Sequence, residues 1–130
     1  MFVVALLLVG RQALSYAGWG AIDLMARLHL WPRDVFEFDA YGYVSSVSLV
    51  HAVVFWLAVI CFMAAFIALI LRSRFALYLL ILSLVPGIGD WVLLTTVPQL
   101  MNDMAGYLHL IGHLLAICAL IFLRQRGVLR

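Results

Sequence analysis

The stretch "SLVPGIGDWVLL", from Ser83 to Leu94, decides how this chain is interpreted, because it places an aspartate inside an apolar run. Pro86, Gly87 and Gly89 precede Asp90. Proline has no backbone N–H to donate and glycine loosens the same turn, so a helix is expected to be irregular here. Irregular backbone at membrane depth survives where protein or a cavity covers it. The pattern therefore predicts a kinked membrane helix whose aspartate faces protein.

The rest of the sequence has the composition of a membrane protein. The chain has 130 residues, of which 68% are hydrophobic and 11% charged, whereas soluble domains are about half apolar and a quarter charged. A hydrocarbon core about 30 Å thick needs about 20 helical residues. Four stretches meet this length, at about 1–26, 44–71, 75–97 and 105–123. The expected fold is an all-α integral membrane protein, a bundle of four transmembrane helices in a single domain over residues 1–130.

Arginine placement predicts the orientation of these spans. Arg72 and Arg74 separate the second span from the third, and Arg124, Arg126 and Arg130 follow the fourth. Positively charged loops face the cytoplasm, so both termini are expected to be cytoplasmic. All eight basic residues are arginine, a composition typical of GC-rich bacterial genomes. We therefore expect an integral protein of the bacterial inner (plasma) membrane.

The predicted outer loop, at about residues 27–43, mixes aromatic and acidic side chains. Its acids are Asp34, Glu37 and Asp39. Aromatic residues collect at membrane interfaces, so one interpretation is an aromatic belt with a short interfacial helix or turn. The other is a lid or docking surface, in which the acids meet a partner or a cation. The sequence leaves both open.

Ionisable residues of different spans are expected to lie in one layer. At 1.5 Å per residue, Asp90, His113 and His51 lie roughly 10–12 Å below the outer boundary, and Arg11 reaches roughly 15 Å from the other side. His109 is one turn from His113 on the same helix face. Charges are costly at this depth, so we expect a buried Arg11–Asp90 ion pair, with the histidines bonded to backbone or serine.

Three other interpretations of this polar layer remain. It could form a pocket for a small ligand or a lipid headgroup, or a path for protons or ions. It could also hold a metal ion, with His51, His109, His113 and Asp90 as candidate ligands. For a haem, His51 and His113 are the pair of axial ligands that would come from facing helices.

The chain shows no sequence signature of catalysis. It has no glycine-rich phosphate loop, Cys-x-x-Cys pair or nucleophile elbow, and its net charge of +2 is split between loops, which argues against nucleic acid as a partner. We assign no catalytic residue and no cofactor. The expected function is that of a small non-catalytic inner-membrane protein, an accessory subunit that supports a membrane complex or binds a hydrophobic ligand or lipid in the polar layer. The alternative is a metal-, haem- or proton-handling protein. Expected partners are membrane lipid and either a larger complex or further copies of the chain.

Two segments carry a resemblance to a known group of proteins. "VPGIGDWVLL" and "YLHLIGHLLAICALIFLR" resemble small uncharacterised bacterial inner-membrane proteins with four membrane helices, which share an intramembrane Gly-Asp and a histidine early in the last helix. The resemblance covers residues 80–124. It implies the four-helix topology and a layer that holds Asp90 and His113, and it implies no reaction.

Overall fold

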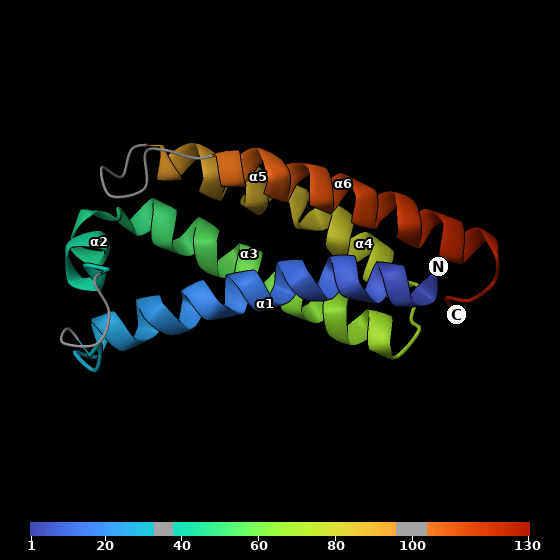
Figure 1. Ribbon diagram of the computed structural model, residues 1–130, viewed down its shortest axis with the longest axis horizontal. Helices are drawn as coiled ribbons and strands as arrows, with labels where there is room; N and C mark the ends of the chain where they lie inside the picture. The colour runs from blue at the N-terminus through green and yellow to red at the C-terminus, as the bar shows by residue number, and fades with distance from the viewer. Residues whose placement is uncertain (33–37, 96–103) are drawn as a thin grey trace.

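The computed structural model describes residues 1–32, 38–95 and 104–130, and the regular secondary structure in these ranges is α-helix. The long helices are α1 (Phe2–Arg27), α3 (Leu49–Ile70) and α6 (Met104–Gln125). A further span is divided into α4 (Phe75–Leu82) and α5 (Leu84–Leu94), and a short α2 (Ala40–Ser46) precedes α3. The long elements run alternately up and down the bundle, with both termini at one end (Figure 1).

The described helices agree with a membrane protein. Within the described residues, four helical segments are long and apolar enough to cross a membrane: α1, α3, α4 together with α5, and residues 106–125 of α6. The second span begins at Leu49, later than the expected residue 44. The reason is local: Val47 is extended, and the Ser48 hydroxyl accepts a hydrogen bond from the His51 backbone N–H at 3.2 Å. Ser48 thus caps a new helix.

The third span is broken at Ser83, just before Pro86, as the opening stretch predicts. Pro86 cannot donate to the carbonyl of Leu82, four residues earlier. The Ser83 hydroxyl donates to the Leu80 carbonyl at 2.7 Å, and the Gly87 N–H donates to the Ser83 carbonyl at 2.9 Å. The break therefore divides the span into two helices that contact different surroundings.

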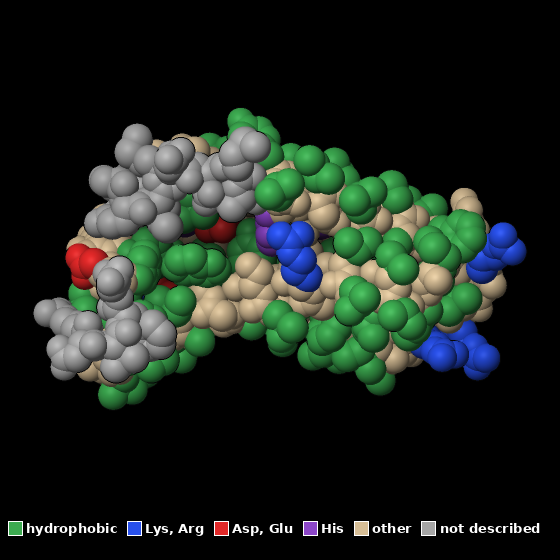
Figure 2. Space-filling view, in the orientation of Figure 1, with side chains coloured by type: hydrophobic (Ala, Val, Ile, Leu, Met, Phe, Trp, Pro, Cys, Tyr) green, Lys and Arg blue, Asp and Glu red, His purple; other side chains and the backbone are tan. Residues whose placement is uncertain are grey.

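The end that carries the termini has a closed apolar core. Its buried side chains come from α1, α3, α4 and α6, and the largest are Phe62, Leu69, Leu80 and Leu120. The chain end joins this region, because the Arg74 N–H donates to the Arg130 carbonyl and the Arg130 N–H to the Arg72 carbonyl, both at 2.8 Å. Basic side chains gather at the same end (Figure 2).

Candidate functional site

Asp90 of α5 is held by side chains of two other helices. Its Oδ1 accepts a hydrogen bond from His51 Nε2 of α3 at 3.0 Å, and its Oδ2 accepts one from the Tyr16 hydroxyl of α1 at 3.2 Å. Asp90 is 4% exposed and His51 2%. Buried polar groups are costly unless they are bonded, so this carboxylate joins α1, α3 and α5 at one point.

The expected ion pair between Arg11 and Asp90 is not formed, and this prediction was wrong. Arg11 is exposed on α1, and Asp90 is paired with His51 instead. The rise per residue predicts how deep in the membrane a side chain lies, but it does not predict the side of the helix from which the side chain projects. Gln12, which is about 100° further around the helix, is the residue that points inward, with 1% exposure.

His113 binds the backbone at the break in the third span. Its Nε2 lies 2.9 Å from the Leu80 carbonyl and 3.2 Å from the Ser83 hydroxyl. An imidazole N–H can donate to this carbonyl, which lies where the helix hydrogen-bonding pattern is interrupted. His113 therefore stabilises the break between α4 and α5, and for it the expected bond to backbone or serine is confirmed. For the other two histidines that expectation was wrong, because His51 Nε2 bonds Asp90 and His109 Nε2 bonds no described residue.

The candidate metal ligands are not brought together. Two of the four candidates, His51 and Asp90, are in hydrogen-bond contact. The other two are His109 and His113. Among the described residues, no three His, Cys, Asp or Glu side chains lie close enough to share a metal ion. For a haem, the Nε2 atoms of His51 and His113 are both engaged in hydrogen bonds within the protein.

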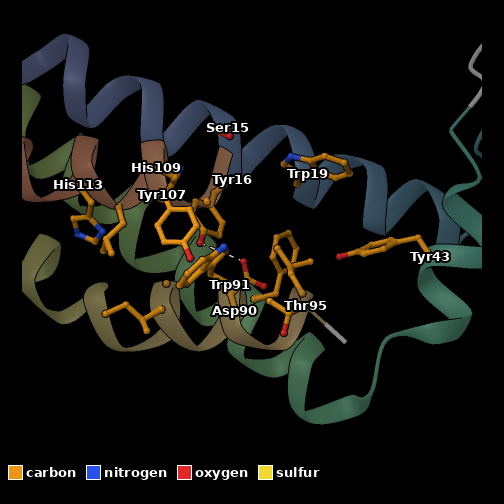
Figure 3. Close-up of a pocket in the computed structure, with 16 residues that line it drawn as sticks. Ser15, Tyr16, Trp19, Tyr43, Asp90, Trp91, Thr95, Tyr107, His109 and His113 are labelled. Carbon is orange, nitrogen blue, oxygen red and sulfur yellow. Dashed lines mark hydrogen bonds between the residues drawn. The ribbon is translucent and has the colours of Figure 1, made fainter. Parts of the chain in front are cut away.

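A partly open pocket of about 350 Å³ lies beside Asp90. α1, α5 and α6 form its walls, and Phe55 of α3 and Tyr43 of α2 complete it (Figure 3). Small-molecule sites are mostly apolar clefts with a few placed polar groups, in a size range of about 300–1,000 Å³. Its lining includes Ser15, Tyr16, Trp19, Asp90, Trp91 and His109.

One pocket-lining polar atom has no partner. His109 Nε2 is buried and makes no hydrogen bond with any described residue. The imidazole ring lies edge-on to Tyr16, with ring centroids 5.2 Å apart, so its position is fixed by packing. The Oε1 atom of Gln12 is also buried without a partner, although Gln12 Nε2 donates to the His109 carbonyl at 2.9 Å. Such groups are uncommon in native proteins, and each calls for an explanation.

Aromatic residues form the other sides of the pocket. The Trp91 indole lies against the α6 backbone at Gly106, where a Cβ would collide with it, and packs edge-on against Tyr107 with centroids 4.9 Å apart. Tyr43 of α2 points toward the cavity (Figure 3). Burial, with a smaller contribution from Asp90, raises the pKa of Tyr43 to about 12, so its hydroxyl stays protonated at neutral pH. The pocket thus has an aromatic lining with hydroxyl donors.

A second buried acid was missed by the sequence interpretation. Asp23 of α1 is 2% exposed. Its Oδ2 accepts hydrogen bonds from Arg27 Nε at 2.9 Å and from Trp56 Nε1 at 3.1 Å. The sequence does indicate this ion pair, because Asp23 and Arg27 are four residues apart and so lie on one face of the helix. Tyr16 was missed as well, since tyrosine in an apolar span carries no charge pattern to reveal it.

The acids of the outer loop are only partly described. Asp34 and Glu37 lie outside the described residues. Asp39 is the N-cap of α2, where its Oδ1 accepts a hydrogen bond from the Gly42 N–H at 3.0 Å. Its position is explained by helix capping, and the expected short helix in this loop is α2. Whether the loop docks a partner or a cation stays a prediction.

Comparison of the chain with protein-family models, curated proteins and solved structures found no match. The resemblance over residues 80–124 therefore stays a prediction, and the interpretation of the site depends on its own chemistry.

Proposed function

We propose that this chain is a non-catalytic integral protein of the bacterial inner membrane, with both termini cytoplasmic, that binds a small amphipathic ligand in the pocket between α1, α5 and α6. The arginines beside the α3–α4 turn and after α6 support this orientation, because they gather at the end with the termini. The pocket favours ligand binding over a purely supporting role in a larger complex.

The observation that carries the proposal is the combination of a partly open aromatic pocket with a buried, unpartnered His109 Nε2. An apolar ligand body would contact the aromatic walls, and a polar group would satisfy the imidazole. The pocket is at the small end of the range for ligand sites. It therefore suits the head and first part of a longer amphiphile whose tail stays among lipid chains.

A non-catalytic role is favoured by the state of the acid. Both Asp90 oxygens accept hydrogen bonds from side chains of neighbouring helices. A general base is within hydrogen-bond reach of the proton it removes, whereas each oxygen of this carboxylate already accepts a bond from another helix. Its bonds join helices, which is a structural role.

Glycine substitutions can test the pocket. The probes are dibrominated stearic acid and the matching alcohol, whose bromines quench tryptophan fluorescence, added to the protein in phosphatidylcholine nanodiscs. In the wild type, Trp91 should be quenched saturably by at least one probe. Gly106→Ala displaces Trp91, because the new Cβ would occupy the indole position, and should weaken binding about tenfold or more.

The matched control is Gly18→Ala, another helical glycine, whose Cβ would meet no atom within 4 Å. It should bind the probes as the wild type does. A Trp91→Phe variant should lose the Trp91 part of the saturable quenching and keep the part from Trp19, the other tryptophan of the pocket lining, which assigns the signal to the pocket. If neither probe gives saturable quenching of Trp91, or if both alanine variants bind as the wild type does, the proposed pocket is not a ligand site.

Proton handling is a second candidate, supported by one observation. Tyr16, Asp90 and His51 form a continuous hydrogen-bonded chain across three helices. Such chains of ionisable groups are a means of proton transfer in membranes. Proton flux into liposomes that contain the protein, compared with an Asp90→Asn variant, tests it: equal flux in both would remove this candidate.

A further inference from the structure

Arg11 lacks the partner that its position demands. It is exposed on α1, well inside a helix that is long enough to cross a membrane, and among the described residues it makes no ion pair. Its neighbours on the same surface, Leu7 and Leu14, are 68% and 66% exposed, as expected of lipid-facing side chains. An arginine at this depth is costly and usually marks a functional contact.

Arg11 does not itself line the pocket, but it lies one turn of α1 before a residue that does. Ser15 and Trp19 follow it at intervals of one turn on α1, and both line the cavity. Across from it on α6, a Cβ on Gly112 would lie 3.5 Å from Arg11 Nη1, so the missing side chain lets the guanidinium approach the helix backbone. On the face drawn in Figure 2, basic and histidine side chains lie side by side near the hollow at mid-length.

The unpartnered His109 belongs to the same location. Gln12, next to Arg11 on α1, donates to the His109 carbonyl, so this part of α1 lies against α6 at His109. His109 lines the pocket with its Nε2 unbonded. A neutral imidazole can place an N–H on this atom. A guanidinium beside the pocket and a buried imidazole nitrogen of a pocket-lining residue therefore lie on neighbouring helices.

This pair of groups matches an anion. Arginine has only donors, in a fork that fits carboxylate and phosphate oxygens. The acids nearby do not compete for it, since Asp90 accepts from His51 and Tyr16. Gln12 Oε1 is an acceptor and would disfavour an anion, but Gln12 is only 1% exposed and its amide is held by the His109 carbonyl.

We infer that the ligand is an anionic amphiphile, whose carboxylate or phosphate group is bound between Arg11 and His109 while its chain lies along the aromatic walls. This inference rests on the proposed function and narrows it to a class of ligand. The shared chemistry is an anionic oxygen group at the end of an apolar chain, as in a fatty acid or a lysophosphatidic acid.

The experiment compares three probes with the same brominated chain: stearate, lysophosphatidic acid and stearyl alcohol. They are added to the full chain in phosphatidylcholine nanodiscs at a pH where the acids are ionised, and Trp91 quenching is measured. At least one anionic probe should bind about tenfold or more tightly than the alcohol. Arg11→Gln should remove this preference by weakening the anionic probes more than the alcohol, and Arg11→Lys should restore part of it.

The control is Arg124→Gln, which removes an arginine at the opposite end of the bundle, where it lies over the Tyr78 ring at 5.3 Å. It should bind every probe as the wild type does. A preference for stearate alone assigns the ligand to carboxylates, and a preference for lysophosphatidic acid alone assigns it to phosphates. Equal binding of all three probes, with no effect of Arg11→Gln, would overturn the inference and leave the pocket proposal standing. Absence of saturable binding by every probe would overturn both.

Discussion

The two helices of the third span, α4 and α5, differ in what they bury. α4 buries Ala76, Leu77 and Leu80 in the apolar core, whereas the one buried residue of α5 is Asp90. Both segments are strongly apolar in sequence, so hydrophobicity does not distinguish them. The difference comes from the neighbours: α4 packs on α3 and α6 in the closed core, and α5 packs on α3 while the pocket separates much of it from α6.

One span can thus combine a half that packs in the core with a half that lines a cavity. In lipid there is no hydrophobic drive between helices, and tight packing and hydrogen bonds hold them together. α4 supplies the packing, and α5 supplies a single polar junction beside a cavity. We therefore expect substitutions on α4 to reduce stability more than equivalent ones on α5.

The largest effect is expected for Leu80→Ala. Leu80 is 0% exposed in the closed core, and such a truncation costs about 2–5 kcal/mol because it leaves a cavity. Leu82→Ala, on the same helix at a residue that is 58% exposed, should cost little. The free energy of unfolding in detergent micelles measures both. Equal losses would show that α4 is not packed as described.

The next largest effect is expected at Asp90, the buried residue of α5. Asp90→Ala leaves the His51 and Tyr16 side chains without their hydrogen-bond acceptor. A buried polar group without a partner costs about 1–3 kcal/mol in soluble proteins, and hydrogen bonds in membrane proteins contribute less. The free energy of unfolding should therefore fall by about 2 kcal/mol. Asp90→Asn keeps one acceptor oxygen and should cost less. In a double-mutant cycle with Tyr16→Phe, additive losses would contradict the contact.

A smaller effect is expected for Leu94→Ala, which sharpens the comparison with Leu80. Leu94 lines the pocket and is only partly buried. Because the space beside it is already empty, its removal should cost about 1 kcal/mol or less. The ratio of the two losses, measured under the same conditions, is the test. A loss as large as that of Leu80→Ala would mean that the pocket half is as tightly packed as the core.

The smallest effect is expected at the joint between the two helices. Ser83→Ala removes the hydroxyl bond to the Leu80 carbonyl, but that carbonyl still accepts from His113. The expected loss is about 0.6 kcal/mol, a typical value for a side-chain hydrogen bond inside a membrane protein. Thermal unfolding of the variant measures it. A loss several times larger would show that Ser83, rather than His113, holds the break.

Much of this fold follows from the sequence, because length and hydropathy specify spans and proline specifies a break. Four apolar segments, the irregular turn near Pro86 and the inward position of Asp90 were all predicted. The level of Asp90 and His51 could also be estimated, since helical rise is constant, and the two are in contact.

The partner of Asp90 could not be predicted in the same way. Arg11 and Tyr16 are both near its level on α1, and the choice depends on how α1 is rotated about its axis. That rotation is set by packing across the whole helix, which buries Ala5, Val9 and Ala13 together with Tyr16. A charge-based argument selects the arginine, and packing selects the tyrosine. The pocket itself leaves no sequence signal, because it arises where α5 and α6 separate.

The break at Ser83 also has a mechanical consequence. Without a hydrogen bond between Pro86 and Leu82, the span is more easily bent there than a continuous helix would be. α4 is fixed in the core, and the chain end is bonded to the turn that precedes it. A change of angle at Ser83 would move α5 relative to α6, between which the pocket lies, while α4 stays in the core. In the proposed function, such bending would let the pocket accept ligand chains of different widths.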